Sequence, residues 1–156
     1  MKNERHPAFR IVECGIGFYL EYGYLYFAVA QGMSPIHNSR LAFELLQTSF
    51  NPDAEEFWLI TLNTDLSTKG LSLIAKGTLN YCPVHPRDLF REAIRANAYA
   101  MIIAHNHPSR NPAPTKEDIV LTKKLCKIAR LLEIPILDHL VFTDKAYYSF
   151  KEHHLI

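Results

Sequence analysis

The stretch Met101-Ile-Ile-Ala-His-Asn-His-Pro-Ser-Arg-Asn-Pro-Ala-Pro-Thr-Lys-Glu-Asp118 joins an apolar run, two histidines, a polar proline-rich loop and a carboxylate at a helix start. His105, His107 and Asp118 form the pattern H-x-H-x10-D. Because residues i and i+2 of a strand point to the same side of a sheet, the two imidazoles can converge on one point. The polar loop needs no burial and can return Asp118 to that point. Imidazole and carboxylate ligands suit Zn²⁺, and three protein ligands leave one position open for water, as in catalytic zinc sites.

Each of these residues also has a plainer interpretation. Two histidines at a strand end can be hydrogen-bonded and inert, although their spacing and the aspartate that follows favour a metal site. Thr115-x-x-Asp118 is close to a capping box, in which the threonine caps the helix and the acid reaches back. The pattern alone leaves Asp118 open as a helix cap or as a metal ligand.

The composition is that of an ordinary globular domain. The chain has 156 residues, of which 48% are hydrophobic and 21% charged, so it can bury a core without disulfides or metal staples. A formal net charge of +1 offers no bulk attraction to nucleic acid or to an anionic membrane. Cys14, Cys82 and Cys126 are widely spaced and form no C-x-x-C pair, which predicts free thiols in a reducing compartment.

The N-terminal region shows no targeting or membrane-spanning pattern. Residues 1–7 are polar and are not followed by the apolar core of a signal peptide. The segment Gly15–Ala30 is interrupted by Glu21 and by glycines, and is too aromatic for a spanning helix. We therefore expect a cytoplasmic protein with no membrane partner.

Hydrophobic periodicity predicts helices that alternate with strands. We expect strands at 9–14, 57–62, 71–75, 99–104, 136–142 and 146–150, a hairpin within 18–30, and helices that open at Ser34-Pro35, at His85 and at Thr115. In the second helix, Leu89, Phe90, Ala93 and Ile94 make one apolar face. The run from Tyr99 to Ala104 is apolar throughout, which predicts a central strand covered on both sides. The pattern indicates a single layered α/β domain with a mixed central β-sheet flanked by helices.

A hydrolytic zinc site also needs a base, because the attacking water must lose a proton. Glu55 and Glu56 directly precede an apolar strand and could lie near the metal. They could equally be a charged pair in an exposed turn, and spacing does not choose between them.

Several segments together resemble the RadC-type JAB domain, the bacterial branch of the MPN/JAMM metalloprotease superfamily. They are His105–Ser109, the Pro-Ala-Pro-Thr-x-x-Asp run that ends at Asp118, Leu137–Leu140, Gly77–Asn80 and His85–Ala93. The similarity extends over 34–150 and implies the MPN/JAMM, cytidine-deaminase-like fold. We accordingly expect 34–156 to form this domain and 1–33 to be an aromatic strand segment packed on it.

The resemblance also implies roles for individual residues. The family's zinc ligands correspond to His105, His107 and Asp118. A glutamate two residues before the position matched by Phe57 orients and deprotonates the metal water in relatives, which selects Glu55 over Glu56. Thr115 stands where relatives have a serine whose hydroxyl helps to stabilise the developing oxyanion.

Two positions depart from the family pattern, and one further motif has an expected supporting role. Thr115 keeps the hydroxyl of the usual serine but adds a methyl group that restricts its rotamer. Arg110 replaces a glycine, so that the loop takes a different turn or the mouth of the site gains a cation. His139 is expected to form a buried hydrogen-bonded pair with Asp138 that supports the metal site.

The resulting expectation is a zinc-dependent metallopeptidase or isopeptidase of the JAMM type, with Zn²⁺ as cofactor and a peptide or protein as substrate. The alternatives are a non-catalytic MPN-type interaction module and a DNA-repair-associated accessory protein. Near-neutral charge disfavours a nucleic-acid partner, and the helix-hairpin-helix module of longer RadC relatives is not recognisable here. The aromatic segment 18–27 could be an interface strand of a homo-oligomer.

Overall fold

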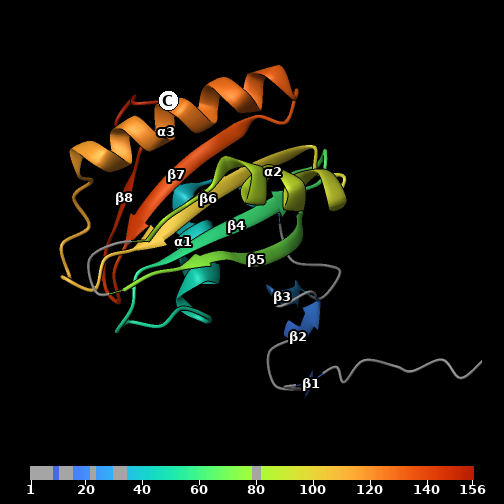
Figure 1. The fold of residues 1–156 in the computed structure, drawn as a ribbon, viewed down its shortest axis with the longest axis horizontal. Helices are drawn as coiled ribbons and strands as arrows, with labels where there is room; N and C mark the ends of the chain where they lie inside the picture. The colour runs from blue at the N-terminus through green and yellow to red at the C-terminus, as the bar shows by residue number, and fades with distance from the viewer. Residues whose placement is uncertain (1–8, 11–15, 22–23, 30–34, 79–81) are drawn as a thin grey trace, which may run out of the picture.

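A mixed sheet runs through the centre of the computed structural model, which describes residues 9–10, 16–21, 24–29, 35–78 and 82–156 (Figure 1). In this described part the strand order is β1-β2-β3-β5-β4-β6-β7-β8. The strands are β1 (Phe9–Arg10), β2 (Ile16–Glu21), β3 (Tyr24–Val29), β4 (Glu56–Leu62), β5 (Thr68–Lys76), β6 (Ala100–Asn106), β7 (Ile136–Phe142) and β8 (Tyr147–Ser149). The helices are α1 (Ser39–Gln47), α2 (Pro86–Arg95) and α3 (Lys116–Leu131). Strands β6 and β7 are parallel and the other neighbours are antiparallel, so the predicted mixed α/β sheet is confirmed.

Strand β6 is buried along its whole length, as its continuous apolar run predicts. It lies between β4, with which it pairs antiparallel, and β7, with which it pairs in parallel. Phe57, near the start of β4, pairs with His105, near the end of β6. The segment that precedes β4 is therefore brought to the same edge of the sheet as the histidines.

Helices cover both faces of the sheet, and Figure 1 shows α1 behind it while α2 and α3 lie on the other side. Side chains alternate along β6, as the strand pleat requires. Ile102 and Ala104 pack in the α1 layer, whereas Met101 and Ile103 pack in the layer of α2 and α3. His105 continues the second set, which places its ring on the side from which α3 approaches.

Two details of the helices differ from the sequence predictions. The first helix begins at Ser39, because Asn38 rather than Ser34-Pro35 supplies the cap: its side chain accepts the Leu41 N–H at 3.0 Å. In α2, Ile94 lies outside the buried face and is 56% exposed. The buried stripe of this short helix is completed by Glu92, whose carboxylate pairs with Arg91 and Arg95.

The predicted hairpin is confirmed by backbone pairing between β2 and β3, and β3 in turn pairs with β5. Residues 11–14 of the predicted first strand lie outside the described residues, as does Ser34. The division between 1–33 and 34–156 stays a prediction. Within the described ranges, no helix is both long and apolar enough to cross a membrane.

Candidate metal centre

Two histidines and one aspartate meet at the end of β6, where α3 begins. His105 Nε2 lies 3.1 Å from His107 Nε2 and 3.2 Å from Asp118 Oδ1. His107 Nε2 lies 3.6 Å from Asp118 Oδ2. One donor atom from each residue lies within 4.8 Å of the others, which makes this trio a candidate metal site. The sequence-predicted ligands are thus brought together.

These separations match those of a small tetrahedral ion. With ligand bonds of about 2.0–2.2 Å, a tetrahedral zinc site places its donor atoms about 3.3–3.6 Å apart. The three separations of 3.1, 3.2 and 3.6 Å lie close to that range. Two neutral nitrogen donors and one carboxylate are also a donor set that zinc prefers. The residues present therefore fit a zinc ion.

Asp118 acts as a helix cap and faces the histidines at the same time. Its Oδ2 accepts the Thr115 N–H and the Thr115 hydroxyl, both at 2.7 Å, while Thr115 Oγ1 accepts the Asp118 N–H at 3.2 Å. This capping box directs Oδ1 toward His105. The two interpretations that the sequence left open, cap and ligand, are compatible because the carboxylate has two oxygens: Oδ2 completes the cap and also faces His107, while Oδ1 is free of the cap and faces His105.

Charges in the site reinforce one another. Burial raises the pKa of Asp118, but its hydrogen bonds with His105, His107 and Thr115 and the charge of His105 outweigh burial and hold this pKa well below its usual range. Burial lowers the pKa of His107, but its contacts with Asp118 and the Asn111 carbonyl outweigh burial and leave this pKa raised. The Asp118 carboxylate therefore stays ionised and favours a positive charge beside it, either a proton on His107 or a metal ion.

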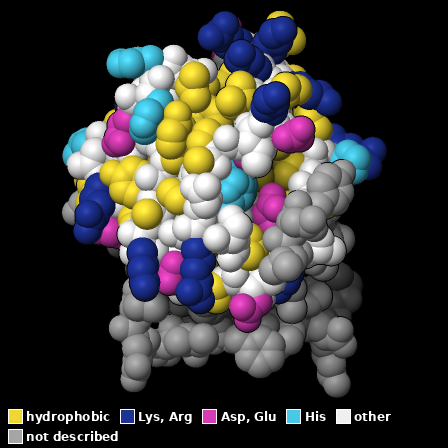
Figure 2. Space-filling view, turned by 90° about the vertical axis from the view of Figure 1, so that its left-hand side faces the viewer, with side chains coloured by type: hydrophobic (Ala, Val, Ile, Leu, Met, Phe, Trp, Pro, Cys, Tyr) yellow, Lys and Arg dark blue, Asp and Glu magenta, His cyan; other side chains and the backbone are white. Residues whose placement is uncertain are grey.

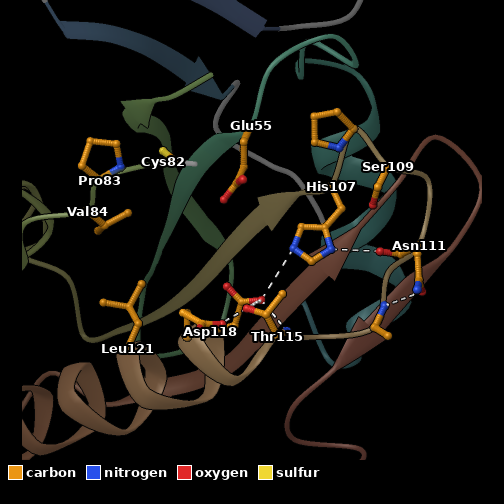
Figure 3. Close-up of a pocket in the computed structure, with 13 residues that line it drawn as sticks. Glu55, Cys82, Pro83, Val84, His107, Ser109, Asn111, Thr115, Asp118 and Leu121 are labelled. Atoms are coloured by element: carbon orange, nitrogen blue, oxygen red, sulfur yellow. Dashed lines mark hydrogen bonds and ion pairs between the residues drawn. The ribbon is translucent and has the colours of Figure 1, made fainter. Parts of the chain in front are cut away.

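Glu55 lies across the cleft from Asp118, and its side chain points toward the histidine and aspartate side chains (Figure 3). Burial raises the pKa of the Glu55 carboxyl; His105 and His107 oppose this shift, and Asp118 adds to it. Glu56 is directed elsewhere, because its carboxylate is buried, accepts the Asn51 N–H and pairs with Lys76. Of the two candidate bases, only Glu55 shares the cleft with the metal trio.

Asn106, between the two histidines, was not singled out by the sequence, yet it holds the Glu55 segment in place. Its Oδ1 accepts the Glu56 N–H at 2.8 Å, and its Nδ2 donates to the carbonyls of Ala54 at 2.9 Å and Asn51 at 3.1 Å. On the other side, Glu55 exchanges backbone hydrogen bonds with Gly77 and Thr78. The backbone of Glu55 is thus held from both sides, by Asn106 through the adjacent residues Ala54 and Glu56 and by Gly77 and Thr78 directly. Asn106 can make these contacts because alternation along the strand turns its side chain away from the side that His105 faces.

His107 and Asp118 of the trio line a cleft of about 600 Å³, while His105 lies buried behind them. Its lining is Glu55, Cys82, Pro83, Val84, His107, Pro108, Ser109, Asn111, Ala113, Thr115, Glu117, Asp118 and Leu121. Figure 2, which faces the left side of Figure 1, shows a histidine beside an acidic side chain near the centre of a face with a hydrophobic band. A cleft with apolar walls and a few convergent polar groups is the usual form of a binding site.

Thr115 and Cys82 both line the cleft, and the surroundings of each limit what its side chain can do. The Thr115 hydroxyl is engaged with Asp118, so its predicted oxyanion role stays a prediction. Burial, helped by the charge of Glu55, raises the pKa of the Cys82 thiol to about 12. A thiol with such a pKa is neutral near pH 7, which argues against Cys82 as a nucleophile.

Arg110 adopts the left-handed backbone conformation, with φ of 63°. Its N–H donates to the His107 carbonyl at 3.1 Å, which closes the turn after the second histidine. This conformation favours glycine, the residue that the family resemblance leads one to expect here. The arginine therefore keeps the turn that suits a glycine, and its exposed side chain does not line the cleft.

The expected buried hydrogen-bonded pair of His139 with Asp138 is present only through the backbone, because the His139 N–H donates to Asp138 Oδ1 at 2.7 Å while the imidazole has other partners. Adjacent residues of β7 point to opposite faces of the sheet, so Asp138 turns toward α1 and accepts the hydroxyls of Ser39 at 2.9 Å and Ser149 at 2.6 Å. His139 faces the metal trio, where its Nε2 lies 2.9 Å from His105 Nδ1. The predicted supporting role has a different partner from the one expected.

Comparison with known proteins agrees with this architecture. The RadC-like JAB domain family model matches residues 36–155. A UPF0758 protein of Moorella thermoacetica is 38% identical over 138 residues, 88% of this chain and 60% of the relative. A UPF0758 protein of Desulforamulus reducens is 45% identical over 104 residues, 67% of this chain and 46% of the relative. A Thermotoga maritima UPF0758 protein is 42% identical over 94 residues, 60% of this chain and 42% of the relative. The chain thus spans about half the length of the curated relatives that it matches.

Proposed function

Because this chain belongs to the RadC-like JAB domain family, we propose that it is a zinc-dependent hydrolase of peptide or isopeptide bonds. The observation that carries the proposal is the meeting of His105, His107 and the Asp118 carboxylate, with donor separations of 3.1 to 3.6 Å that lie close to those of a tetrahedral zinc site, beside an open cleft that His107 and Asp118 line. His105, His107 and Asp118 would hold the ion. Zinc in such a site acts as a Lewis acid and lowers the pKa of a coordinated water to about 7.

Glu55 is the proposed general base. A base works best when its pKa lies near the working pH, and burial shifts the pKa of Glu55 upward in that direction. Its backbone is held on both sides, by Asn106 through the flanking residues and by Gly77 and Thr78 directly. The carboxylate is therefore fixed at one wall of the cleft, where it can take a proton from water and return it to a leaving amine.

Thr115 is the proposed donor to the oxyanion that forms at the scissile carbonyl. Its hydroxyl lies in the cleft wall beside Asp118, and a donor so placed contributes on the order of 3 kcal/mol in other hydrolases. In this structure the Thr115 hydroxyl donates its proton to Asp118 Oδ2, so the hydroxyl must turn away from Asp118 before it can donate to a substrate.

Metal analysis tests the site directly. Purified protein should hold about one zinc ion per chain, and His105→Ala should remove it because two ligands hold zinc far more weakly than three. Unchanged zinc content in the variant would refute the ligand assignment.

Hydrolysis is tested with a proteome-derived peptide library, with new termini identified by mass spectrometry. Zinc-loaded protein should generate them, and Glu55→Gln should keep the zinc but lose the cleavage. Glu56→Gln is the matched control, since the amide oxygen still accepts the Asn51 N–H and the residue lies outside the cleft. Full zinc occupancy without cleavage of peptides or isopeptide-linked conjugates would instead favour a non-catalytic interaction module.

A further inference from the structure

A chain of short hydrogen bonds runs behind the metal trio, from α3 through β7 to β6. Thr122 Oγ1 lies 2.6 Å from the Asp118 carbonyl oxygen and 2.6 Å from His139 Nδ1. The other ring nitrogen of His139 lies 2.9 Å from His105 Nδ1. The chain therefore begins at the backbone of one proposed ligand and ends at the ring of another.

The positions of the protons in this chain follow from counting donors. A carbonyl oxygen carries no hydrogen, so the Thr122 hydroxyl must donate to Asp118. That hydroxyl has one proton, and the contact with His139 Nδ1 therefore requires the N–H of the imidazole. A neutral His139 then has a bare Nε2, which can only accept, so His105 must carry its proton on Nδ1.

When His105 is neutral, its Nε2 is therefore bare and faces His107 Nε2 at 3.1 Å and Asp118 Oδ1 at 3.2 Å; His105 can donate from Nε2 to Asp118 only when it carries both ring protons. The same holds for His107 by an independent route, because its Nδ1 lies 2.9 Å from the Asn111 carbonyl, which can only accept. Two bare nitrogens 3.1 Å apart repel each other unless a cation lies between them. In their neutral forms both histidines thus present Nε2 as the acceptor for a cation.

Packing against aromatic side chains holds the His139 and His105 rings in this hydrogen-bonded arrangement. His139 is fully buried and stacks on Phe150, with ring centroids 4.7 Å apart and an angle of 21°. Phe57 stacks on His105, with centroids 6.0 Å apart and an angle of 6°. His105 is itself only 2% exposed. Bulk water therefore does not compete for these ring nitrogens, and their direct partners decide which nitrogen of each ring carries the proton.

We propose that Thr122 and His139 are positioning residues that fix His105 in the tautomer whose Nε2 is free to bind a metal. The inference rests on the proposed zinc site and adds to it two residues that do not touch the metal. Partners of this kind set the tautomer and basicity of metal-bound histidines in other proteins, and their loss weakens metal affinity about 10- to 100-fold.

The Thr122→Val substitution tests this chain, because valine keeps the shape of threonine but removes the hydroxyl. His139 then has no acceptor for its Nδ1–H, and the tautomer with hydrogen on Nε2 becomes favourable. That tautomer donates to His105 Nδ1 and leaves the proton of His105 on Nε2, where it blocks the metal. Zinc affinity, measured by competition with a chromogenic chelator, should fall about 10- to 100-fold, and Thr122→Ser should restore most of it because serine keeps the hydroxyl.

Nitrogen-15 NMR of the metal-free wild type provides a test that needs no variant. At about pH 8.5, roughly two units above the ordinary histidine pKa, His105 should show hydrogen on Nδ1 and a bare Nε2. Hydrogen on Nε2 would overturn the inference, as would tight zinc binding by Thr122→Val equal to that of the wild type. If the wild type binds no zinc, the proposed function fails, whereas the NMR result still decides the tautomer.

Discussion

Replacing Asn106 with alanine should loosen the segment that carries Glu55. The carboxamide makes three hydrogen bonds, at 2.8, 2.9 and 3.1 Å, and the residue is 1% exposed. A net contribution of about 1 kcal/mol for each bond gives a loss of about 3 kcal/mol in the free energy of unfolding. Solvent does not fully recover the loss, since the Glu56 N–H is left without this partner in a buried place, while the half-buried Ala54 carbonyl also loses its donor.

Urea denaturation of the metal-free protein measures this loss. Asn63→Ala is the matched control, because the Asn63 side chain makes a single bond, from Nδ2 to Ser67 Oγ, and should cost about 1 kcal/mol. Hydrogen exchange should also show faster exchange of the Glu56 amide in Asn106→Ala. If Asn106→Ala lost no more stability than Asn63→Ala and the Glu56 amide stayed protected from exchange, the hydrogen bonds of Asn106 would not be what holds the Glu55 segment in place.

Three further predictions concern the site and its loop. The folded pKa of His107 is raised above 6.5, so the stability that its pairing with Asp118 contributes is full just below pH 6.5 and is lost as pH rises through the raised value. The folded pKa of Asp118 is held well below 3.8, so its contribution to stability is full above pH 3.8 and is lost as pH falls through that depressed value. Zinc competes with the proton on His107, so zinc affinity should increase between pH 6 and 8, and a pH-independent affinity in chelator competition would contradict this. Arg110→Gly should stabilise the protein by about 1 kcal/mol in thermal denaturation because it relieves a left-handed residue, whereas Arg110→Ala keeps its Cβ and should bring no such gain. Cys82, with a pKa of about 12, should react with iodoacetamide at pH 8 more than about tenfold slower than in urea-unfolded protein, and equal rates would show that its thiol is not shielded.

Much of the fold was predictable because apolar periodicity reflects local geometry. The run before His105 is a fully buried central strand, and the periodic segment that follows Thr115 is the long helix. Predictions failed where two local signals competed. Ser34-Pro35 is a reasonable helix start on its own, but Asn38 has the cap geometry, and in α2 the charged Glu92 lies on the buried face while the apolar Ile94 is exposed.

For the metal centre, the sequence by itself determined which residues could act as ligands, because strand alternation and helix capping are short-range effects. His105 lies near the end of β6, His107 directly follows that strand, and Asp118 stands in the first turn of α3. Spacing left Glu55 and Glu56 open and the family resemblance favoured Glu55, but only the tertiary structure shows that Glu55 lines the cleft while Glu56 does not. The tertiary structure alone shows which Asp118 oxygen faces which partner and which groups the His139 ring contacts. Those arrangements depend on which strands pair and which helix covers which face, and such long-range contacts leave no periodic trace along the chain.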